Sequence, residues 1–260
     1  MSWFLVGATP LLAVGVYGKD TAMPKHGKKY EQVAKLIEQP SYLPDEAIKL
    51  LKQTSYVKFD PTVEIHMNLG VDPRHADQQV RGVATLPAGT GRKQRILVFA
   101  QGDQAREAAE AGADYIGSDD LVQRIEGGWL DFDVAIAARD QMGKVSRLGR
   151  ILGRRGLMPN PRAGTVTDDV AGVIREVRKG RVEFRVERAG IVHGPVGKLS
   201  FTEEQLRANL ASFIAAVVAA KPAGAKGQYV RSISVSSTMG PGIRLELQPA
   251  LALASEAMVA

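Results

Sequence analysis

Cysteine is absent from the 260-residue sequence, which excludes disulfide bonds and thiolate chemistry and fits a reducing compartment. The few histidines do not have the spacing of metal ligands: His26, His66, His75 and His193. We therefore expect the chain to hold no metal ion and no cofactor.

A basic leader is absent from the N-terminus, where the stretch "MSWFLVGATPLLAVGVYG" carries no charged side chain. Glycines and a proline interrupt any helix there, so neither a secretory signal nor a membrane anchor is favoured. Met23 opens the hydrophilic sequence "MPKHGKKYEQ", which is typical of a cytosolic start. We expect residues 1–22 to be an incorrectly assigned start or a disordered tail, and the mature chain to begin at Met23 or Pro24.

The motifs of nucleotide-dependent enzymes are incomplete. The stretch "GPVGKLS" has Leu199 where a P-loop needs a hydroxyl residue, and "GTGRKQ" lacks the third glycine of a dinucleotide-binding fingerprint. Two carboxylate pairs have no histidine or lysine nearby in sequence: Asp131 with Asp133, and Asp168 with Asp169. Solvated faces or helix starts explain these pairs better than acid–base catalysis does.

Charge is positive overall and unevenly distributed along the chain. The sequence has 34 Lys and Arg against 28 Asp and Glu, a net charge of +6, which favours a polyanionic partner such as nucleic acid. Residues 103–140 hold ten acids and three bases, whereas residues 142–162 hold six bases and no acid. This segregation is more informative than the net value, because it places the positive charge on particular surfaces.

Apolar periodicity divides the chain after Met23 into three blocks. The first block predicts helices near 30–38 and 44–53 and an alternating strand from 62 to 69. A second short strand, "VRGVATL", ends at the Pro/Gly loop "PAGTGRKQ", where a boundary is expected. The middle block alternates short apolar runs with helical stretches, which indicates a small parallel or mixed sheet covered by helices.

The third block returns to antiparallel strands with one helix. The stretches "RVEFRVE" and "GIVHGPVGKL" predict a hairpin around residues 188–190, and Thr202 with Gln205 forms a capping-box sequence ahead of a helix. The strands "YVRSISVSS" and "GIRLEL" then flank the turn "TMGPG". Neither outer block has enough strands for a stable sheet by itself. We therefore expect one discontinuous α+β domain with an antiparallel sheet, residues 23–88 and 182–260, interrupted by an inserted Rossmann-like α/β domain, residues 89–181.

The most basic stretch of the chain is "VSRLGRILGRRGLMPNPRAGTV", residues 145–166, with five arginines and no acid. Its beginning has the spacing of an amphipathic helix over residues 142–152, and Arg154 and Arg155 follow in an expected turn. Clusters of this kind are the usual electrostatic footprint of a phosphate-binding surface. Direct RNA contact by the Arg154–Arg155 pair and a purely structural role are both open at this point.

Several long motifs between Met23 and Pro241 make the sequence resemble the uL1 family of large-subunit ribosomal proteins. They occur in that family's order: "MPKHGKKY", "KFDPTVEIHMNLGVDPR", "DQQVRG", "GWLDFD", "MGKVSRLGRILGRRGLMPNPRAGTV", "GPVGKLSF" and "KGQYVRSISVSSTMGP". The sequence departs from the family pattern at Arg154, where most relatives are expected to have proline, and in residues 1–22, which have no counterpart.

The resemblance implies a cytoplasmic ribosomal protein, with two domains, at the base of a mobile stalk of the large subunit. Its discontinuous domain would bind large-subunit rRNA among other ribosomal components, and the stalk would move with exit-site tRNA and assist its release. Members of the family also repress translation of their own operon by binding an mRNA that mimics the rRNA site. The resemblance thus implies rRNA, exit-site tRNA and operon mRNA as partners, and no membrane.

The residues themselves indicate the same RNA-binding surface. Strand alternation turns Ile233 and Val235 to one side and a row of serines to the other, and such hydroxyls can contact phosphate and 2′-OH groups. After the row comes a turn in which Met239 offers an apolar tip. The residues of this row and turn are Ser232, Ser234, Ser236, Thr238, Met239, Gly240 and Pro241.

Lys58 and Phe59 precede the first predicted strand. A core position for Phe59 is the alternative to RNA contact, and the resemblance favours contact, since family members place a Lys-Phe pair against the rRNA. Secondary phosphate contacts are expected from five basic residues: Lys25, Lys28, Lys29, Arg154 and Arg155. Two other functions stay open: an RNA-acting enzyme with a nucleotide-binding insert, and a free-standing regulator that binds mRNA without joining ribosomes.

Overall fold

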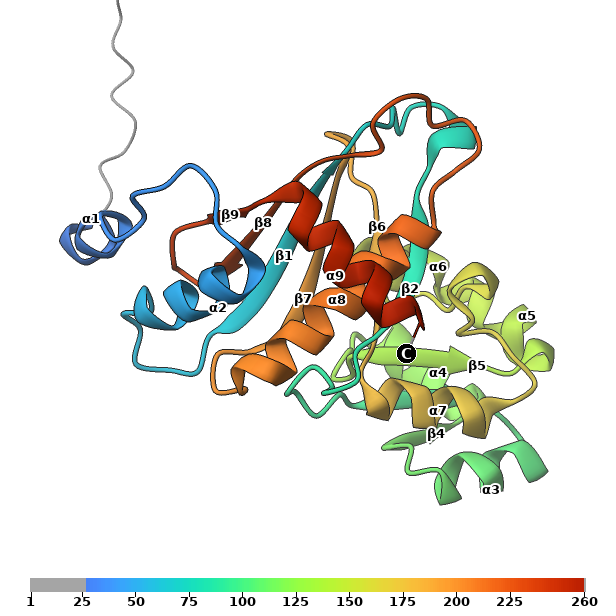
Figure 1. Cartoon of the computed structure of the whole chain (residues 1–260). Helices are drawn as coiled ribbons and strands as arrows, with labels where there is room; N and C mark the ends of the chain where they lie inside the picture. Colours follow the sequence, from blue (N-terminus) through green and yellow to red (C-terminus); the bar gives the residue numbers. More distant parts are fainter. Residues whose placement is uncertain (1–26, 260) are drawn as a thin grey trace, which may run out of the picture.

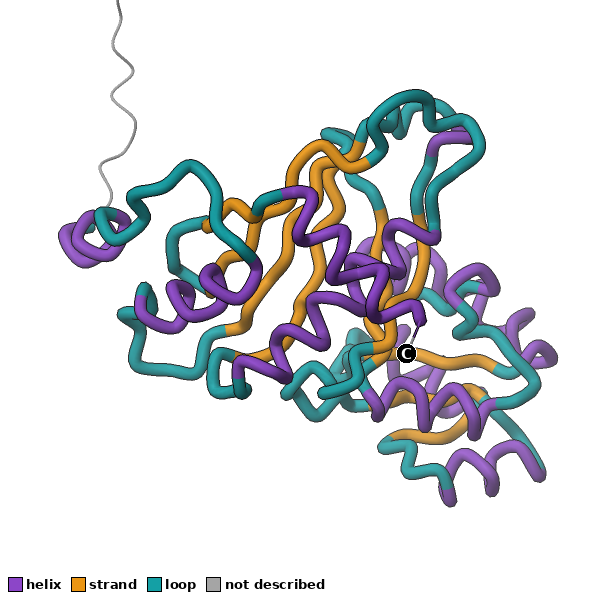
Figure 2. Tube along the Cα trace, in the orientation of Figure 1, coloured by secondary structure: helices purple, strands orange, loops and turns teal. Residues whose placement is uncertain are grey.

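The computed structural model describes residues 27–259. The expected extension, residues 1–22, and the predicted contact Lys25 lie outside this range. Three sheets and the helices around them make up the described chain (Figures 1 and 2). The expected mixture of an antiparallel and a parallel sheet with covering helices is confirmed. Within residues 27–259, no helix combines the length and the apolar character needed to cross a membrane.

The largest sheet is antiparallel and has four strands in the order β7-β1-β8-β9. The strands are β1 (Thr62–Leu69), β7 (Ile191–Lys198), β8 (Val230–Ser237) and β9 (Ile243–Leu245). Three helices cover one face of this sheet (Figure 1): α2 (Pro44–Gln53), α8 (Glu203–Ala219) and α9 (Leu247–Val259). Because the helices cover only this face, the opposite face of the sheet is left for other contacts.

The predicted start of α8 is confirmed in detail. The Thr202 hydroxyl accepts a hydrogen bond from the Gln205 N–H, and the Gln205 side chain accepts one from the Thr202 N–H. This capping box satisfies two backbone donors that the first turn would otherwise leave unpaired. The second predicted helix is also confirmed as α2, whereas α1 (Lys28–Ala34) ends four residues earlier than predicted from the spacing. The N–H groups of Glu38 and Gln39 instead donate to the Tyr42 hydroxyl.

The predicted hairpin around residues 188–190 is confirmed at its turn, but its two strands separate into different sheets. Strand β6 (Arg181–Arg185) pairs with β2 (Arg81–Thr85) in a separate two-stranded sheet, and β7 pairs with β1. The turn itself is present: Val186 and Val192 form an antiparallel bridge, the Glu187 N–H donates to the Ile191 carbonyl, and the Gly190 N–H donates to the Glu187 carbonyl. Burial decides the pairing: the Phe184 ring is 2% exposed and packs 5.6 Å from the Phe213 ring of α8. A local turn sequence cannot foresee this distant partner.

A parallel sheet with strand order β4-β3-β5 forms the third unit of the fold. Its strands are β3 (Ile96–Phe99), β4 (Tyr115–Gly117) and β5 (Val134–Ala137). One face packs against α4 (Asp119–Glu126), α5 (Met142–Val145) and α6 (Gly149–Arg155). The other face packs against α3 (Asp103–Glu110) and α7 (Val170–Lys179). Residues 97 and 99 of β3 enter one core and residues 96 and 98 the other, as strand alternation requires.

The predicted helix over residues 142–152 is interrupted. The chain forms α5, then a 3₁₀ turn (Ser146–Leu148), then α6. The Ser146 hydroxyl donates to the Met142 carbonyl at 2.6 Å, a back-bond that competes with regular helix geometry. Of the four residues predicted to point inward, Val145, Leu148 and Leu152 are nonetheless fully buried, and Ile151 is partly buried against the same core. The amphipathic interpretation of this stretch is therefore confirmed and its continuity is not.

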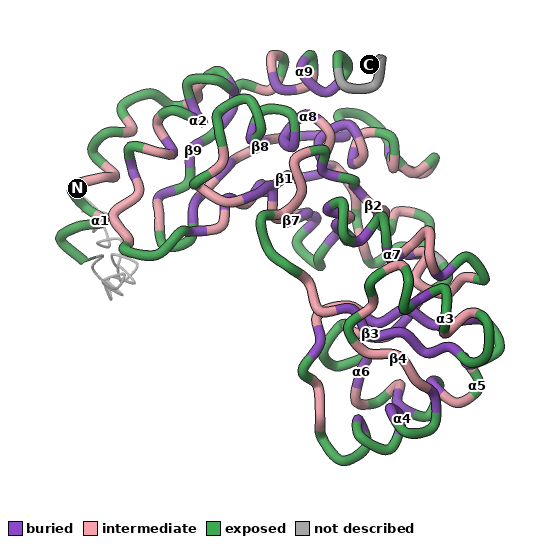
Figure 3. The backbone as a smooth tube through the Cα atoms, turned by 90° about the horizontal axis from the view of Figure 1, so that it is seen from below, coloured by how far each residue is buried: buried purple, intermediate pink, exposed green. Residues whose placement is uncertain are grey.

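Core residues separate into groups along the chain. One cluster contains buried residues from the ranges 47–86 and 182–254, and the two clusters around the parallel sheet draw on residues 97–152 and 96–177. The chain crosses twice between the first cluster and the two clusters around the parallel sheet. The two crossings lie side by side, because Thr85 pairs with Arg181 and the Leu86 N–H donates to the Gly180 carbonyl. Figure 3 shows the buried segments gathered around the two larger sheets.

The carboxylate pairs considered in the sequence have structural roles. Asp131 and Asp133 pair with the Arg95 guanidinium, and Asp133 also pairs with Arg92. The Asp169 side chain caps α7 by accepting the Gly172 N–H at 2.8 Å. Neither pair lies against a histidine or lysine in the ion pairs and hydrogen bonds of residues 27–259, which favours the structural interpretation.

Candidate nucleic-acid interface

The uncovered face of the four-stranded sheet carries the predicted row of hydroxyls. Ile233 and Val235 of β8 are buried under the helices. The serines that alternate with them are partly exposed: Ser232, Ser234 and Ser236. The predicted alternation is thus confirmed. In the neighbouring strand β1, the polar residues paired with these serines are Asn68, His66 and Glu64. The face therefore presents hydrogen-bonding groups from at least two strands.

Two histidines meet on this face. The Nδ1 atoms of His66 and His193 lie 2.6 Å apart, and His66 Nε2 lies 3.0 Å from the Ser236 hydroxyl. Burial is the main reason why the pKa of His66 is lowered, nearby His193 lowers it further, and Glu64 opposes the shift. A neutral His66 can donate one hydrogen bond and accept another in the series His193, His66 and Ser236, which keeps the Ser236 hydroxyl in place.

The sequence did not indicate the histidine pair. Alternation places His66 on the polar side of its strand, but its contact with His193 depends on the pairing of β1 with β7, which no local pattern reveals. In the described residues, no group of three or more histidine, cysteine or acidic side chains is arranged to hold a metal ion. The histidines belong to the hydrogen-bonding surface of the sheet.

The turn after β8 is held by a set of hydrogen bonds. The Thr238 N–H donates to the Thr62 carbonyl at 2.9 Å, and the Thr62 N–H donates to the Thr238 hydroxyl at 3.1 Å. The Tyr56 hydroxyl donates to the Met239 carbonyl at 2.7 Å, and the Gly240 N–H donates to the Ser237 carbonyl at 2.8 Å. The turn is therefore ordered before any ligand arrives, which lowers the entropic cost of binding.

Met239 is held in an unusual backbone conformation at the tip of this turn. Its φ of 69° is the only positive φ of a non-glycine residue in the described chain. The side chain is 64% exposed. Strain combined with the exposure of a large apolar group is typical of a functional position rather than a stabilising one.

The two residues after Met239 shape the turn. A Cβ on Gly240 would lie 2.3 Å from the Ser237 hydroxyl, so any other residue there would displace that hydroxyl. Pro241, in contrast, is buried. This burial differs from the expected RNA contact by Pro241 and is typical of a residue that supports the turn.

Phe59 is exposed, which rules out the alternative that it belongs to the core. Its exposed fraction is 56%, and Lys58 beside it is also exposed. Phe59 and Met239 are the two most exposed large apolar residues in the described part of the chain. Both lie at the same end of the sheet, because Phe59 shortly precedes β1 and Met239 follows β8, and Val63 pairs with Ser237 there.

Lys198 is a further cation at this end of the sheet that the sequence did not single out. Its Nζ donates to the Thr62 hydroxyl at 2.9 Å, in the strand that follows Phe59. The neighbouring loop is fixed by Asp60, whose carboxylate accepts hydrogen bonds from the Ser200 N–H and hydroxyl. The stretch "GPVGKLS", which fails as a P-loop, thus contributes its lysine to the surface around Phe59.

The expected secondary contacts lie on other elements. Lys28 and Lys29 are exposed on α1. Arg154 and Arg155 are exposed in the last turn of α6, before the left-handed Gly156, rather than in a turn beyond the helix. The structure therefore brings Lys58, Phe59 and the residues from Ser232 to Gly240 to one sheet, and holds the arginine pair on the unit built around the parallel sheet.

A sheet with one face open, bearing hydroxyls, cations and exposed apolar tips, defines a nucleic-acid-binding class of surface. Comparison with known proteins agrees. The chain is 56% identical over 229 residues to the large ribosomal subunit protein uL1 of Thermomicrobium roseum, with 86% of this chain and 95% of the relative covered. Residues 51–241 match the model of the ribosomal protein L1p/L10e family.

The chain belongs to the ribosomal protein L1p/L10e family. This membership confirms the resemblance seen in the sequence and identifies a ribosomal protein with a structural, non-enzymatic role, found with ribosomes in the cytoplasm. The alternative of an RNA-acting enzyme is thereby removed.

Proposed function

We propose that the chain binds rRNA of the large ribosomal subunit with the end of the open sheet that carries Phe59 and Met239. The observation that supports this best is the exposure of these two apolar side chains on a surface held rigid by hydrogen bonds. In a protein free of RNA, exposing both side chains brings no stability. Against RNA, each can lie on a ribose or a base.

The surrounding groups complete this recognition. Lys58 and Lys198 neutralise phosphates, which supplies affinity that depends on salt. The hydroxyls of Ser232, Ser234 and Ser236 contact phosphate and 2′-OH groups along the RNA strand. Shape, rather than a base-by-base code, provides the specificity, because the turn after β8 presents backbone and an apolar tip in one fixed geometry.

We further propose that residues 23–88 and 182–260 form one discontinuous RNA-binding domain and that residues 89–181 form an inserted, Rossmann-like domain. The separation of the core clusters along the chain supports this division. The pairing of Thr85 with Arg181 also supports it, because both connections leave the first unit at one place. The insert would then project from the rRNA-bound domain at the mobile stalk.

Exit-site tRNA is the proposed partner of the insert. Arg147, Arg150, Arg154 and Arg155 are exposed on its 3₁₀ turn and α6 and have no carboxylate partner among the ion pairs of the described chain. Such a surface suits the phosphates of a passing tRNA and would assist its movement and release. Neutralising the four arginines should slow tRNA release from ribosomes without removing the protein from them.

Repression of the chain's own operon mRNA is the remaining part of the proposed function. An mRNA that copies the shape of the rRNA site would occupy the same Phe59–Met239 surface, so both RNAs must compete for it. A reporter gene behind the operon leader should be repressed by the wild-type chain and not by Met239→Asp. Repression that survives Met239→Asp would show that the mRNA uses another surface.

Sucrose-gradient fractionation tests the ribosomal assignment. The wild-type protein should migrate with large subunits, and Met239→Asp should move to the top of the gradient while remaining folded. A wild-type protein found only at the top, away from ribosomes, would instead support the free-standing mRNA regulator.

A further inference from the structure

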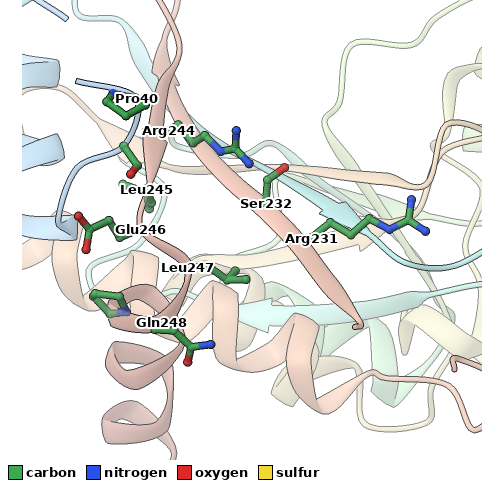
Figure 4. Close-up of a pocket in the computed structure, with 10 residues that line it drawn as sticks. Pro40, Arg231, Ser232, Arg244, Leu245, Glu246, Leu247 and Gln248 are labelled. Carbon is green, nitrogen blue, oxygen red and sulfur yellow. The ribbon is translucent and has the colours of Figure 1, made fainter. Parts of the chain in front are cut away.

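A cavity with two arginines in its lining opens beside β9, away from the Met239 turn. Its volume is about 440 Å³, within the range of ligand-binding sites. Residues from β8, β9, the start of α9 and the segment 40–41 line it. Figure 4 shows Ser232 between the side chains of Arg231 and Arg244. Two cations and a hydroxyl at one cavity favour an anionic ligand.

Arg231 of β8 and Arg244 of β9 are both exposed to solvent beside the cavity. Arg244 pairs across the sheet with Ser234 and is exposed, and in Figure 4 its guanidinium points toward Ser232. Arg231 is also exposed, at an irregularity of the pairing in which Asn68 aligns with Ser232 and Leu69 with Val230. Such a bulge adds one residue to a strand and re-aims its side chain.

Neither guanidinium has a partner within the described part of the protein. Among residues 27–259, the side chains of Arg231 and Arg244 make no ion pair and no hydrogen bond, whereas Arg95 and Arg178 pair with carboxylates. Glu246 also lines the cavity, but its carboxylate points away from Arg244 in Figure 4. Two unpaired guanidinium groups beside a hydroxyl suit the oxygens of a phosphodiester.

We propose that Arg231, Ser232 and Arg244 form a phosphate-binding site for the backbone of the same RNA that contacts the Met239 turn. This inference rests on the proposed function. Strand β8 carries both sites: the turn follows its last residue and Arg231 is its second residue. The six residue steps from Ser232 to Thr238 span roughly 20 Å at the usual rise of a strand. The RNA strand therefore runs along the serine row from the turn to this cavity.

The site should contribute affinity without sequence preference, because backbone phosphates carry no base information. The test uses a transcript of the large-subunit rRNA and the purified full chain, with binding measured over a series of salt concentrations. The variant is Arg231→Ala with Arg244→Ala. Its matched control is Arg106→Ala with Arg175→Ala, which removes the same charge from exposed positions on α3 and α7.

The double variant should bind about tenfold more weakly near 0.1 M salt, and the slope of log affinity against log salt should fall by about 1.5, as expected for two lost phosphate contacts. The charge-removal control should change the slope by much less. Replacement of both arginines by lysine should restore the slope, which separates loss of charge from loss of fold. A double-alanine variant that behaves like the control would overturn the inference.

The same measurements distinguish this inference from the proposed function. If Met239→Asp abolishes binding and the double-alanine variant matches the control, the recognition surface stands and the second site is wrong. If Met239→Asp binds like the wild type, the proposed recognition surface is wrong, and the inference that rests on it falls as well.

Discussion

Met239 is the residue at which the proposed binding role and stability conflict most clearly. Its φ of 69° lies in the left-handed region, which is unfavourable by about 1–2 kcal/mol for residues other than glycine. Replacing Met239 by glycine removes this strain but adds entropy to the unfolded chain. We expect Met239→Gly to leave the free energy of unfolding in urea within about 1 kcal/mol of the wild type, and to weaken rRNA binding at least tenfold. A large loss of stability would mean that the side chain is structural.

His66 gives a prediction about pH. Its pKa is lowered by burial and then by His193, so the folded chain resists protonation more than the unfolded chain. Above about pH 6.5 both states are neutral and the effect vanishes. As pH falls below that value, the unfolded state binds the proton first, and the free energy of unfolding decreases.

Replacing His66 by asparagine removes this contribution. The acidic residues near the histidine pair remain in the variant: Glu64, and Glu187, which has its carboxylate 3.6 Å from His193. Between about pH 7.5 and 5.5, urea unfolding should therefore show a smaller loss of stability for His66→Asn than for the wild type. An equal loss in both proteins would contradict the assignment.

Some features of single residues could be predicted from the sequence and others could not. The serine row follows from strand alternation, which depends only on neighbouring residues. The residue type of Phe59 is compatible with either the core or the surface. Its exposed fraction of 56% in the structure places it on the surface. The contact between His66 and His193 joins residues that are far apart in the chain, so no local pattern contains it.

At the scale of elements, close packing between β7 and α8 gives a sharp prediction. A Cβ on Gly194 would lie 2.3 Å from the Phe213 ring, whereas a Cβ on Gly153 of α6 would meet nothing within 4 Å. Gly194→Ala should therefore lower the free energy of unfolding by about 1–3 kcal/mol through overpacking.

The matched substitution Gly153→Ala should instead raise the free energy of unfolding by about 0.5–1 kcal/mol, since alanine favours a helix. Urea denaturation of both variants measures the contrast. Equal effects of the two substitutions would show that the close contact at Gly194 relaxes without cost.

The elements that could be predicted are those defined by local rules. The capping box of α8, the alternation of β1 and the Pro44 start of α2 each depend on residues a few positions apart. The turn between β6 and β7 forms as predicted, but the pairing of the two strands beyond it was wrong, because burial at long range decides strand partners, here that of Phe184 against α8. Interruption of the helix at Ser146 depends on one side-chain back-bond that competes with the apolar pattern.

At the scale of the whole molecule, the paired connections allow the insert to be removed. Thr85 pairs with Arg181, and the Leu86 N–H donates to the Gly180 carbonyl, so β2 and β6 already resemble a hairpin with its loop expanded. Replacing residues 87–179 by Asn-Gly should close a two-residue turn between them.

The shortened chain should unfold cooperatively in urea and bind rRNA within about tenfold of the full chain, since only secondary phosphate contacts are lost. A variant with a longer Gly-rich connection controls for strain in the turn. Unfolded products from both connections would contradict the proposal of a discontinuous domain.

We propose that rRNA recognition resides at Phe59 and the Met239 turn rather than in the arginine-rich stretch of the insert. Filter binding of an rRNA transcript by three folded variants tests it: Met239→Asp, Phe59→Ala with Thr238→Ala, and Arg154→Ala with Arg155→Ala. Aspartate tolerates the left-handed conformation, so the first variant should fold.

The first two variants should lose about 3 kcal/mol or more of binding free energy, roughly a hundredfold in affinity, because each stacking contact contributes about 1–3 kcal/mol. The arginine pair should cost less than about tenfold, mostly at low salt. If the arginine pair instead causes the larger loss, the primary RNA site lies in the insert and the role given to the sheet is wrong.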